Sequence, residues 1–154
     1  MAQITDLYIY PVKSLKGIPL KEAQTAKRGL EFDREWMITD NNYNFISQRE
    51  KELMATIQTD IDSSSLVLTS TNQKALKIPL NSKRAGKVKA KVWDDLCEAF
   101  DEGDEASIWL TEVLGMFNQS PLRLVRIDHE SERQVPKQYL DGTHAESAFS
   151  DQFP

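Results

Sequence analysis

A cation and a hydroxyl stand side by side at the end of the first predicted strand. Residues 8–12 are aromatic, β-branched or proline, which favours an extended strand that ends at a sheet edge, a bulge or a terminus. Lys13 and Ser14 follow directly, and Gly17 gives the chain freedom to turn. A lysine and a serine so placed can bind an anionic oxygen. On these residues alone, an ordinary turn is the more frequent arrangement.

Arg34 is the second candidate for anion binding. It has an acid on either side and stands just before a predicted strand at residues 35–39. A guanidinium binds phosphate through paired hydrogen bonds, each worth about 1.5–3 kcal/mol. The alternative is a surface arginine in local ion pairs that contribute little. If Arg34 faces the same end of the sheet as Lys13 and Ser14, the three side chains form one site.

Other reactive residue types give little sign of a site. Residues 47–50 (Ser-Gln-Arg-Glu) form a third polar cluster, which can add a donor to the same rim or close a loop salt bridge. Cys97 has apolar neighbours and is best explained as a small buried strand residue. His129 and His144 are isolated, so the sequence contains no metal-ligand pattern. We expect no metal site and no catalytic residue in this chain.

The elements that must position these residues are mainly β-strands. Short alternating segments separated by turn residues are typical of a β-barrel or a sandwich. With one helix, or two if a helical turn at residues 50–54 is counted, the chain is α+β with mainly β structure. The expected strands cover residues 4–12, 20–27, 35–39, 45–48, 55–61, 66–68, 76–80, 88–92, 96–100 and 122–127.

The one clear helix follows an acidic stretch. Asp101 or Asp104 can cap its N-terminus, and Gly115 lies where a helix commonly ends. Apolar residues on one helical face occupy positions 106, 109, 110, 113 and 114. We also expect Trp36, Trp93 and Trp109 to lie in the core.

Length and charge limit the possible classes of protein. The chain has 154 residues, enough for one domain, which we place at residues 1–128 with a polar linker at 129–154. A net charge of −5 argues against nucleic-acid binding, and the alternating lysines of residues 83–91 predict the solvent face of a strand. No apolar run approaches the roughly 18 residues of a membrane span, and no secretory signal is present. A single cysteine fits a reducing cytoplasm.

Four segments in register resemble a known family. The order and spacing of these segments are similar to the N-terminal β-barrel domain of MOSC-type molybdenum cofactor proteins across roughly the first 55 residues. That family includes the mitochondrial amidoxime-reducing component and bacterial reductases of N-hydroxylated bases. The segments are residues 10–17 (YPVKSLKG), 28–30 (RGL), 32–37 (FDREWM) and 47–50 (SQRE).

The resemblance implies a cofactor and the residues that hold it. By motif match, Lys13, Ser14 and Arg34 would hold the molybdopterin phosphate. In the family the molybdenum is held by a cysteine of a following MOSC domain, which Cys97 does not match. The parent protein would bind the molybdenum cofactor, whereas this part alone would be inactive and bind none tightly. Residues 148–151 resemble the segment that leads into that MOSC domain, so we expect it to follow in the same polypeptide.

Three functions follow from these observations. The first is a domain of a molybdenum oxidoreductase that reduces N-hydroxylated compounds and takes electrons from an iron–sulfur or flavin donor. The second is a free-standing β-barrel that binds an anionic ligand or a protein partner. The third is part of a carrier that delivers sulfur or the cofactor to other enzymes.

Overall fold

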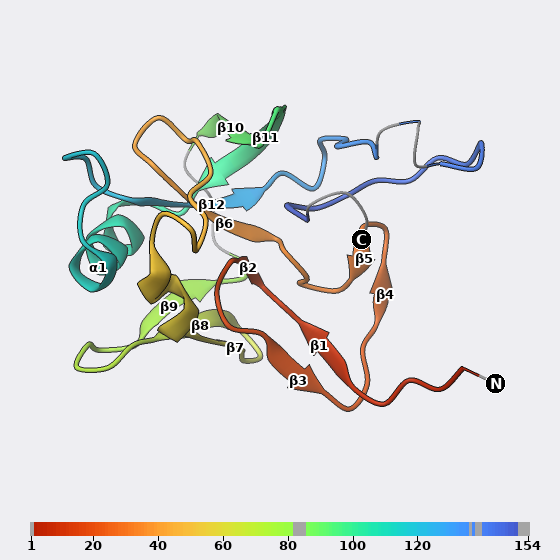
Figure 1. Ribbon diagram of the computed structural model, residues 1–154, viewed down its shortest axis with the longest axis horizontal. Helices are drawn as coiled ribbons and strands as arrows, with labels where there is room; N and C mark the ends of the chain where they lie inside the picture. The colour runs from red at the N-terminus through yellow and green to blue at the C-terminus, as the bar shows by residue number, and fades with distance from the viewer. Residues whose placement is uncertain (1, 82–85, 136, 138–139, 151–154) are drawn as a thin grey trace.

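A five-stranded sheet forms the centre of the chain (Figure 1). The computed structural model describes residues 2–81, 86–135, 137 and 140–150. The terminal strand β2 runs parallel to β6, and every other pair in this sheet is antiparallel. The strand order is β10 (Lys87–Val92), β11 (Asp95–Asp101), β12 (Arg123–Ile127), β6 (Trp36–Thr39) and β2 (Val12–Lys13).

Three smaller antiparallel sheets and one helix complete the fold. The described strands thus form four separate sheets rather than one closed barrel. The α-helix α1 (Asp104–Leu114) and the short 3-10 helix η1 (Glu52–Thr56) confirm a mainly β chain with one or two helices. The smaller sheets pair β7 (Gln58–Ile61), β8 (Ser65–Thr69) and β9 (Leu76–Pro79), then β1 (Leu7–Ile9) with β3 (Ile18–Leu20), and β4 (Thr25–Ala26) with β5 (Gly29–Leu30).

Alternation along the central strands produces a core on each face of the five-stranded sheet. Trp36 and Leu124 face the larger core, which also contains residues of β8, β9 and α1. Met37 and Val125, one position further along, face a smaller core that contains Phe149. Because successive strand residues point to opposite faces, the sheet is apolar on both sides. It is therefore covered on one side by the β7–β9 sheet with α1, and on the other by the C-terminal segment.

Some expected boundaries differ from the structure. Residues 20–27 are not one strand, because β3 ends at Leu20 and β4 spans only Thr25–Ala26. Residues 45–48 return beside β6 only through an isolated bridge between Thr39 and Phe45. In the lysine-rich stretch, Lys87, Lys89 and Lys91 are exposed as expected, whereas residues 83–85 lie outside the described residues.

The N-terminus of α1 is also built differently from expectation. Gly103, at φ 96°, precedes the helix and has no side-chain cap, so neither Asp101 nor Asp104 is the N-cap residue. Asp101 instead accepts the Gly103 N–H at 2.7 Å and two hydrogen bonds from Arg123, each of 2.7 Å. The prediction for the C-terminus is confirmed, since α1 ends at Leu114 and is capped by Gly115 with φ 75°.

The described residues between 131 and 150 fold back onto the sheet, although the sequence predicts an exposed loop or linker there. The Val135 N–H donates to Ala145 O at 3.0 Å, and the Ser147 N–H donates to Arg133 O at 2.8 Å. Phe149 is fully buried in the smaller core. These residues therefore pack on an apolar face of the five-stranded sheet despite their polar composition. Residues 151–154 lie outside the described residues, and the domain boundary at 128 stays a prediction.

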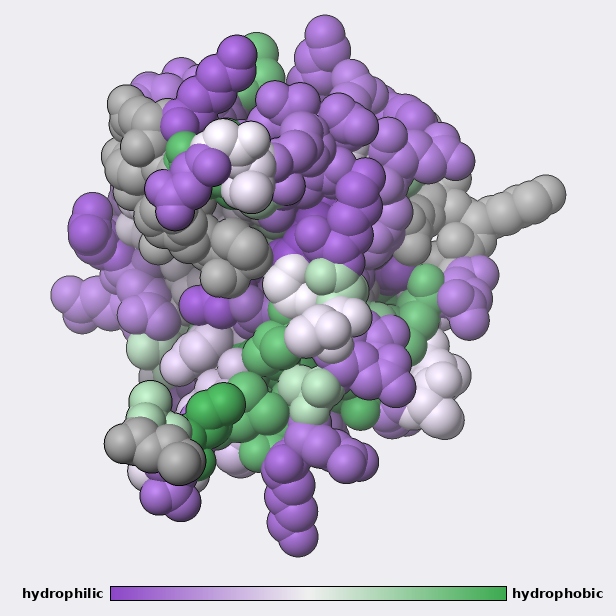
Figure 2. Space-filling model, turned by 90° about the vertical axis from the view of Figure 1, so that its right-hand side faces the viewer, coloured by the Kyte–Doolittle hydropathy of each residue, from purple (hydrophilic) through white to green (hydrophobic). Residues whose placement is uncertain are grey.

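The surface divides into a polar and an apolar half on one side of the molecule. Figure 2 shows hydrophobic side chains gathered in the lower half of this face, where the N-terminal segment and the β1–β3 hairpin lie, below a hydrophilic upper half. Ile4 and Tyr8, from this part of the chain, are 82% and 48% exposed. No helix among the described residues is long and apolar enough to cross a membrane.

Candidate functional site

Ser14 lies at the third position of a tight turn that follows β2. The Leu15 N–H donates to Val12 O at 3.1 Å, and Ser14 has a φ of 67°. A residue with a Cβ atom loses roughly 1–2 kcal/mol in a left-handed conformation, so contacts with neighbouring residues must stabilise Ser14 in this conformation. Leu15 is 2% exposed and anchors the turn in the larger core. The turn is therefore fixed by packing beneath it.

Gln48 holds the same turn from the side. Its Nε2 donates to Ser14 O at 2.7 Å. Gln48 belongs to a turn closed by Ser47 and Glu50, in which the Ser47 N–H donates to Glu50 Oε2 at 2.7 Å. The hydrogen bond from the Ser47 side chain lowers the pKa of Glu50. Residues 47–50 thus lie beside Ser14 at the rim of the candidate site. The Nε2 donor of Gln48, however, is engaged in supporting the Ser14 turn.

Lys13 is buried against two aromatic rings. It is 6% exposed, and its Nζ lies 5.0 Å from the ring centroid of Phe45 and 5.8 Å from that of Trp93. The two rings meet edge to face at 5.3 Å. Trp93 is 47% exposed at φ 54°, so the expectation that it lies in the core is wrong. It stands in the turn between β10 and β11, where one ring face packs near Lys13 and the rest meets solvent.

Arg34 is held by its sequence neighbour and by Tyr10. Its Nη1 pairs with Asp33 Oδ2, and its Cζ lies 4.7 Å from the ring centroid of Tyr10. The Asp33 Oδ1 accepts the Tyr10 N–H at 2.7 Å, and the Arg34 N–H donates to Tyr10 O at 2.8 Å. The Arg34 side chain remains 35% exposed. The guanidinium is therefore oriented while part of its donor edge stays accessible.

The register of β2 and β6 separates the two cations. Val12 pairs with Trp36 and Lys13 pairs with Met37 in a parallel ladder. Arg34 lies beside Tyr10, two residues before β6 begins and three residues before the partner of Lys13. Lys13 and Arg34 consequently flank opposite ends of this short strand pair, instead of sharing one end as expected. Long side chains of this kind can still converge on a ligand between them.

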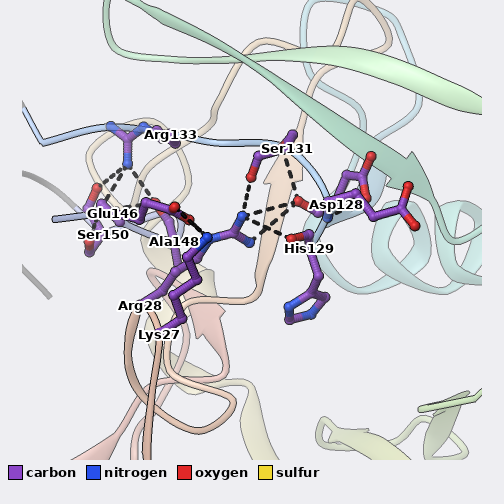
Figure 3. Close-up of polar contacts among 11 residues, drawn as sticks. Lys27, Arg28, Asp128, His129, Ser131, Arg133, Glu146, Ala148 and Ser150 are labelled. Atoms are coloured by element: carbon purple, nitrogen blue, oxygen red, sulfur yellow. Dashed lines mark hydrogen bonds and ion pairs between the residues drawn. The ribbon is translucent and has the colours of Figure 1, made fainter. Parts of the chain in front are cut away.

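A second polar cluster joins the C-terminal segment to the rest of the chain (Figure 3). Arg28 donates to the carbonyls of Asp128 and His129, at 3.3 and 3.4 Å, and to that of Ser131. Arg133 donates to Ala148 O at 2.6 Å and to Ser150 O at 2.9 Å. Each guanidinium also pairs with a carboxylate, since Arg133 Nη2 donates to Asp95 Oδ2 at 2.8 Å and Arg28 Nε lies 3.5 Å from Glu146 Oε2. These arginines therefore serve to fasten backbone segments, a role that their sequence context did not reveal.

Possible metal ligands meet at one point of this cluster. One ligand atom each from Glu132, His144 and Glu146 lies within 4.8 Å of the others. Glu146 is already engaged, since Lys27 Nζ lies 2.6 Å from its Oε1 and Arg28 Nε lies 3.5 Å from its Oε2. The two cationic side chains at the buried Glu146 carboxylate would repel a bound metal cation, so the geometry does not favour a metal ion.

Cys97 is a structural residue. It is 7% exposed, and its Sγ donates to Ala90 O at 3.3 Å. Burial raises the pKa of the Cys97 thiol to about 11. A protonated, buried thiol is neither a nucleophile nor a metal ligand at neutral pH.

Known proteins resemble this chain along most of its length. Human molybdenum cofactor sulfurase is 29% identical over 150 residues, which cover 92% of this chain and 16% of the sulfurase. Human mitochondrial amidoxime-reducing component 1 is 29% identical over 143 residues, covering 90% of this chain and 42% of that protein. The chain therefore spans less than half the length of either relative.

A solved structure supports the fold alone. The solution structure of a Bordetella bronchiseptica protein superposes with a TM-score of 0.53 over 71% of this chain and 90% of the other, at 17% identity.

The family model described as the MOSC N-terminal beta barrel domain matches residues 1–117. The chain accordingly belongs to the MOSC N-terminal beta barrel domain family.

Proposed function

We propose that this chain is the N-terminal domain of a molybdenum cofactor protein, and that Lys13, Ser14 and Arg34 hold the phosphate of the cofactor. The observation that carries the proposal is the turn at Ser14 with a buried ammonium beside it. Ser14 adopts φ 67° and Lys13 is 6% exposed between β2 and two aromatic rings. A left-handed residue kept in place by its surroundings is typical of functional sites.

The donor set suits a phosphate ester. Lys13 supplies a point charge, Ser14 a hydroxyl, and Arg34 a planar fork that can bind two oxygens. Each is positioned before a ligand arrives, which reduces the entropy lost on binding. Cys97 is buried and protonated, so no thiolate among the described residues is available to the metal. The residues of this chain would therefore bind and orient the phosphate, while the metal ligand comes from elsewhere in a longer polypeptide.

The cofactor would supply two-electron chemistry at the metal. In the first candidate activity, an N-hydroxylated compound receives two electrons and two protons, its N–O bond breaks, and water leaves. The electrons would come from an iron–sulfur or flavin donor. A following MOSC domain of the same polypeptide would complete the active site. A reducing compartment such as the cytoplasm fits the free thiol of Cys97.

The molybdenum content of the full-length protein tests the site. Lys13→Ala and Arg34→Ala should each lower the molybdenum retained after purification, while the circular dichroism spectrum stays unchanged. Lys21→Ala and Lys89→Ala are matched controls, because each removes one positive charge from an exposed side chain outside the proposed site. Unchanged molybdenum content in both site variants would refute the assignment. A native protein that binds pyrophosphate but never contains molybdenum would favour the free-standing binding module.

A sulfur-transfer or carrier role is the second candidate. It is favoured by the identity to human molybdenum cofactor sulfurase, which equals the 29% identity to the amidoxime-reducing component. Both roles need the same phosphate site in this domain. Assaying the full-length protein for reduction of an N-hydroxylated amidine, and separately for sulfuration of an acceptor enzyme's cofactor, distinguishes them.

A further inference from the structure

We propose that Tyr10 is a positioning residue of the anion site: its ring fixes the Arg34 guanidinium, and the close approach of Gly17 fixes the ring. This inference rests on the proposed function, because it assigns how the same site is held ready. The Arg34 Cζ lies 4.7 Å from the centre of the Tyr10 ring. The guanidinium therefore stacks on an aromatic face, an arrangement that is strongest for arginine.

Gly17 supports the ring from another side. A Cβ atom at position 17 would lie 2.7 Å from Tyr10 Cε1 and 2.9 Å from Tyr10 Cζ, closer than real contacts allow. Only glycine lets the ring lie where it does, because the ring would have to shift to admit a methyl group. Gly17 stands three residues after Ser14. The Tyr10 ring thus contacts both Gly17 and Arg34, which are far apart in the sequence.

Stacking leaves the guanidinium free to bind an anion. The ring contacts the flat face of the group, whereas hydrogen bonds to phosphate leave from its edge. Asp33 occupies one edge position through its contact with Arg34 Nη1, and it is the only acid paired with Arg34 among the described residues. A carboxylate contact alone leaves a long side chain free to rotate about the remaining bonds. The ring removes that freedom, so less entropy is lost when an anion binds.

The backbone of Tyr10 makes it possible to isolate the role of the ring. The Tyr10 N–H and C=O bind Asp33 Oδ1 and the Arg34 N–H, at 2.7 and 2.8 Å. These bonds involve only main-chain atoms of Tyr10, so they persist in any side-chain variant. Tyr10→Phe keeps the ring, Tyr10→Leu removes it, and Gly17→Ala displaces it. Tyr8→Leu is the matched control, since Tyr8 lies on β1, two residues before Tyr10, and is 48% exposed.

The experiment uses this chain with pyrophosphate as the probe. The Arg34 Nε–H signal, assigned by its loss in Arg34→Ala, should be shifted upfield by the ring current in the wild type and in Tyr10→Phe. In Tyr10→Leu the shift should disappear, and in Gly17→Ala it should shrink. Pyrophosphate affinity, measured by calorimetry, should fall roughly 3- to 10-fold in Tyr10→Leu and Gly17→Ala. It should change less than about 2-fold in Tyr10→Phe and Tyr8→Leu.

Three other outcomes would count against the role of Tyr10. An Arg34 signal that does not change in Tyr10→Leu would overturn the proposal, because the ring would not hold the guanidinium. A changed signal with unchanged pyrophosphate affinity would also overturn it, provided that Arg34→Ala weakens binding. If Arg34→Ala itself has no effect on pyrophosphate affinity, the assignment of Arg34 in the proposed function fails, and the role of Tyr10 in that site falls with it.

Discussion

The backbone N–H of Phe149 donates a hydrogen bond of 2.9 Å to the carbonyl oxygen of Arg34. The Phe149 side chain is fully buried in the smaller core, together with Met37 and Val125. Arg34 has a φ of 53°, a left-handed conformation that needs support from its surroundings. The C-terminal segment thus stabilises the backbone of a residue that we propose contacts phosphate.

Phe149→Ala should lower the free energy of unfolding by about 3–5 kcal/mol, the usual cost of deleting a buried phenyl ring. Urea unfolding followed by tryptophan fluorescence measures this change. The amide signal of Glu35 should shift in the same variant, because its N–H belongs to the same peptide group as the Arg34 carbonyl that accepts the Phe149 hydrogen bond. Phe149→Leu should cost less, since it retains most of the apolar volume. If Phe149→Ala unfolds like the wild type, the segment around Phe149 does not pack on the sheet in solution.

The parts of the fold that depend on periodicity could be predicted from the sequence. The strands at Leu76–Pro79 and Lys87–Val92 and the helix at Asp104–Leu114 follow from apolar spacing, and Gly115 caps the end of the helix as expected. Local patterns did not predict residues 131–150, because only the uncovered face of the sheet explains why Phe149 is buried. Tertiary packing decided where the polar segment lies.

The residues of the candidate site could be proposed from the sequence, but their arrangement in space could not. Motif matching selected Lys13, Ser14 and Arg34, and their role in the site stays a prediction. Neither the left-handed conformations of Ser14 and Arg34 nor the parallel β2–β6 register has a local sequence signal. Arg34 stacks on Tyr10, a residue 24 positions earlier in the sequence, so no short motif contains both residues.

Lys27 should control how the stability of this chain depends on pH. The Lys27 ammonium, whose Nζ lies 2.6 Å from Glu146 Oε1, lowers the pKa of Glu146 against the opposing effect of burial. A carboxyl whose pKa is lower in the folded state contributes stability above its unfolded pKa of about 4.3. That contribution is lost as the pH falls through the folded pKa. Lys27→Met should therefore destabilise the chain at neutral pH and bring acid unfolding to a higher pH.

Thermal unfolding at a series of pH values between about 3 and 7 measures this effect. The difference in melting temperature between wild type and Lys27→Met should be largest near neutral pH and shrink as Glu146 becomes protonated in both. Lys21→Met, which removes an exposed lysine, should show no such dependence. A difference that stays constant across the range would contradict the role given to Lys27.

The ion pair of Arg126 and Glu102 should be strongly coupled, because both side chains are buried in the larger core. Arg126 Nε lies 2.5 Å from Glu102 Oε1, and the two side chains are 2% and 4% exposed. Trp36 Nε1 donates to the same oxygen at 2.8 Å. Either Arg126→Met or Glu102→Leu removes one charge of this pair while the other charge stays buried, so each should cost about 3–5 kcal/mol of unfolding free energy. Arg126→Met/Glu102→Leu removes both charges and should cost clearly less than the sum of the single changes. Urea unfolding of the four proteins completes the cycle, and additive losses would show that the two charges do not depend on each other.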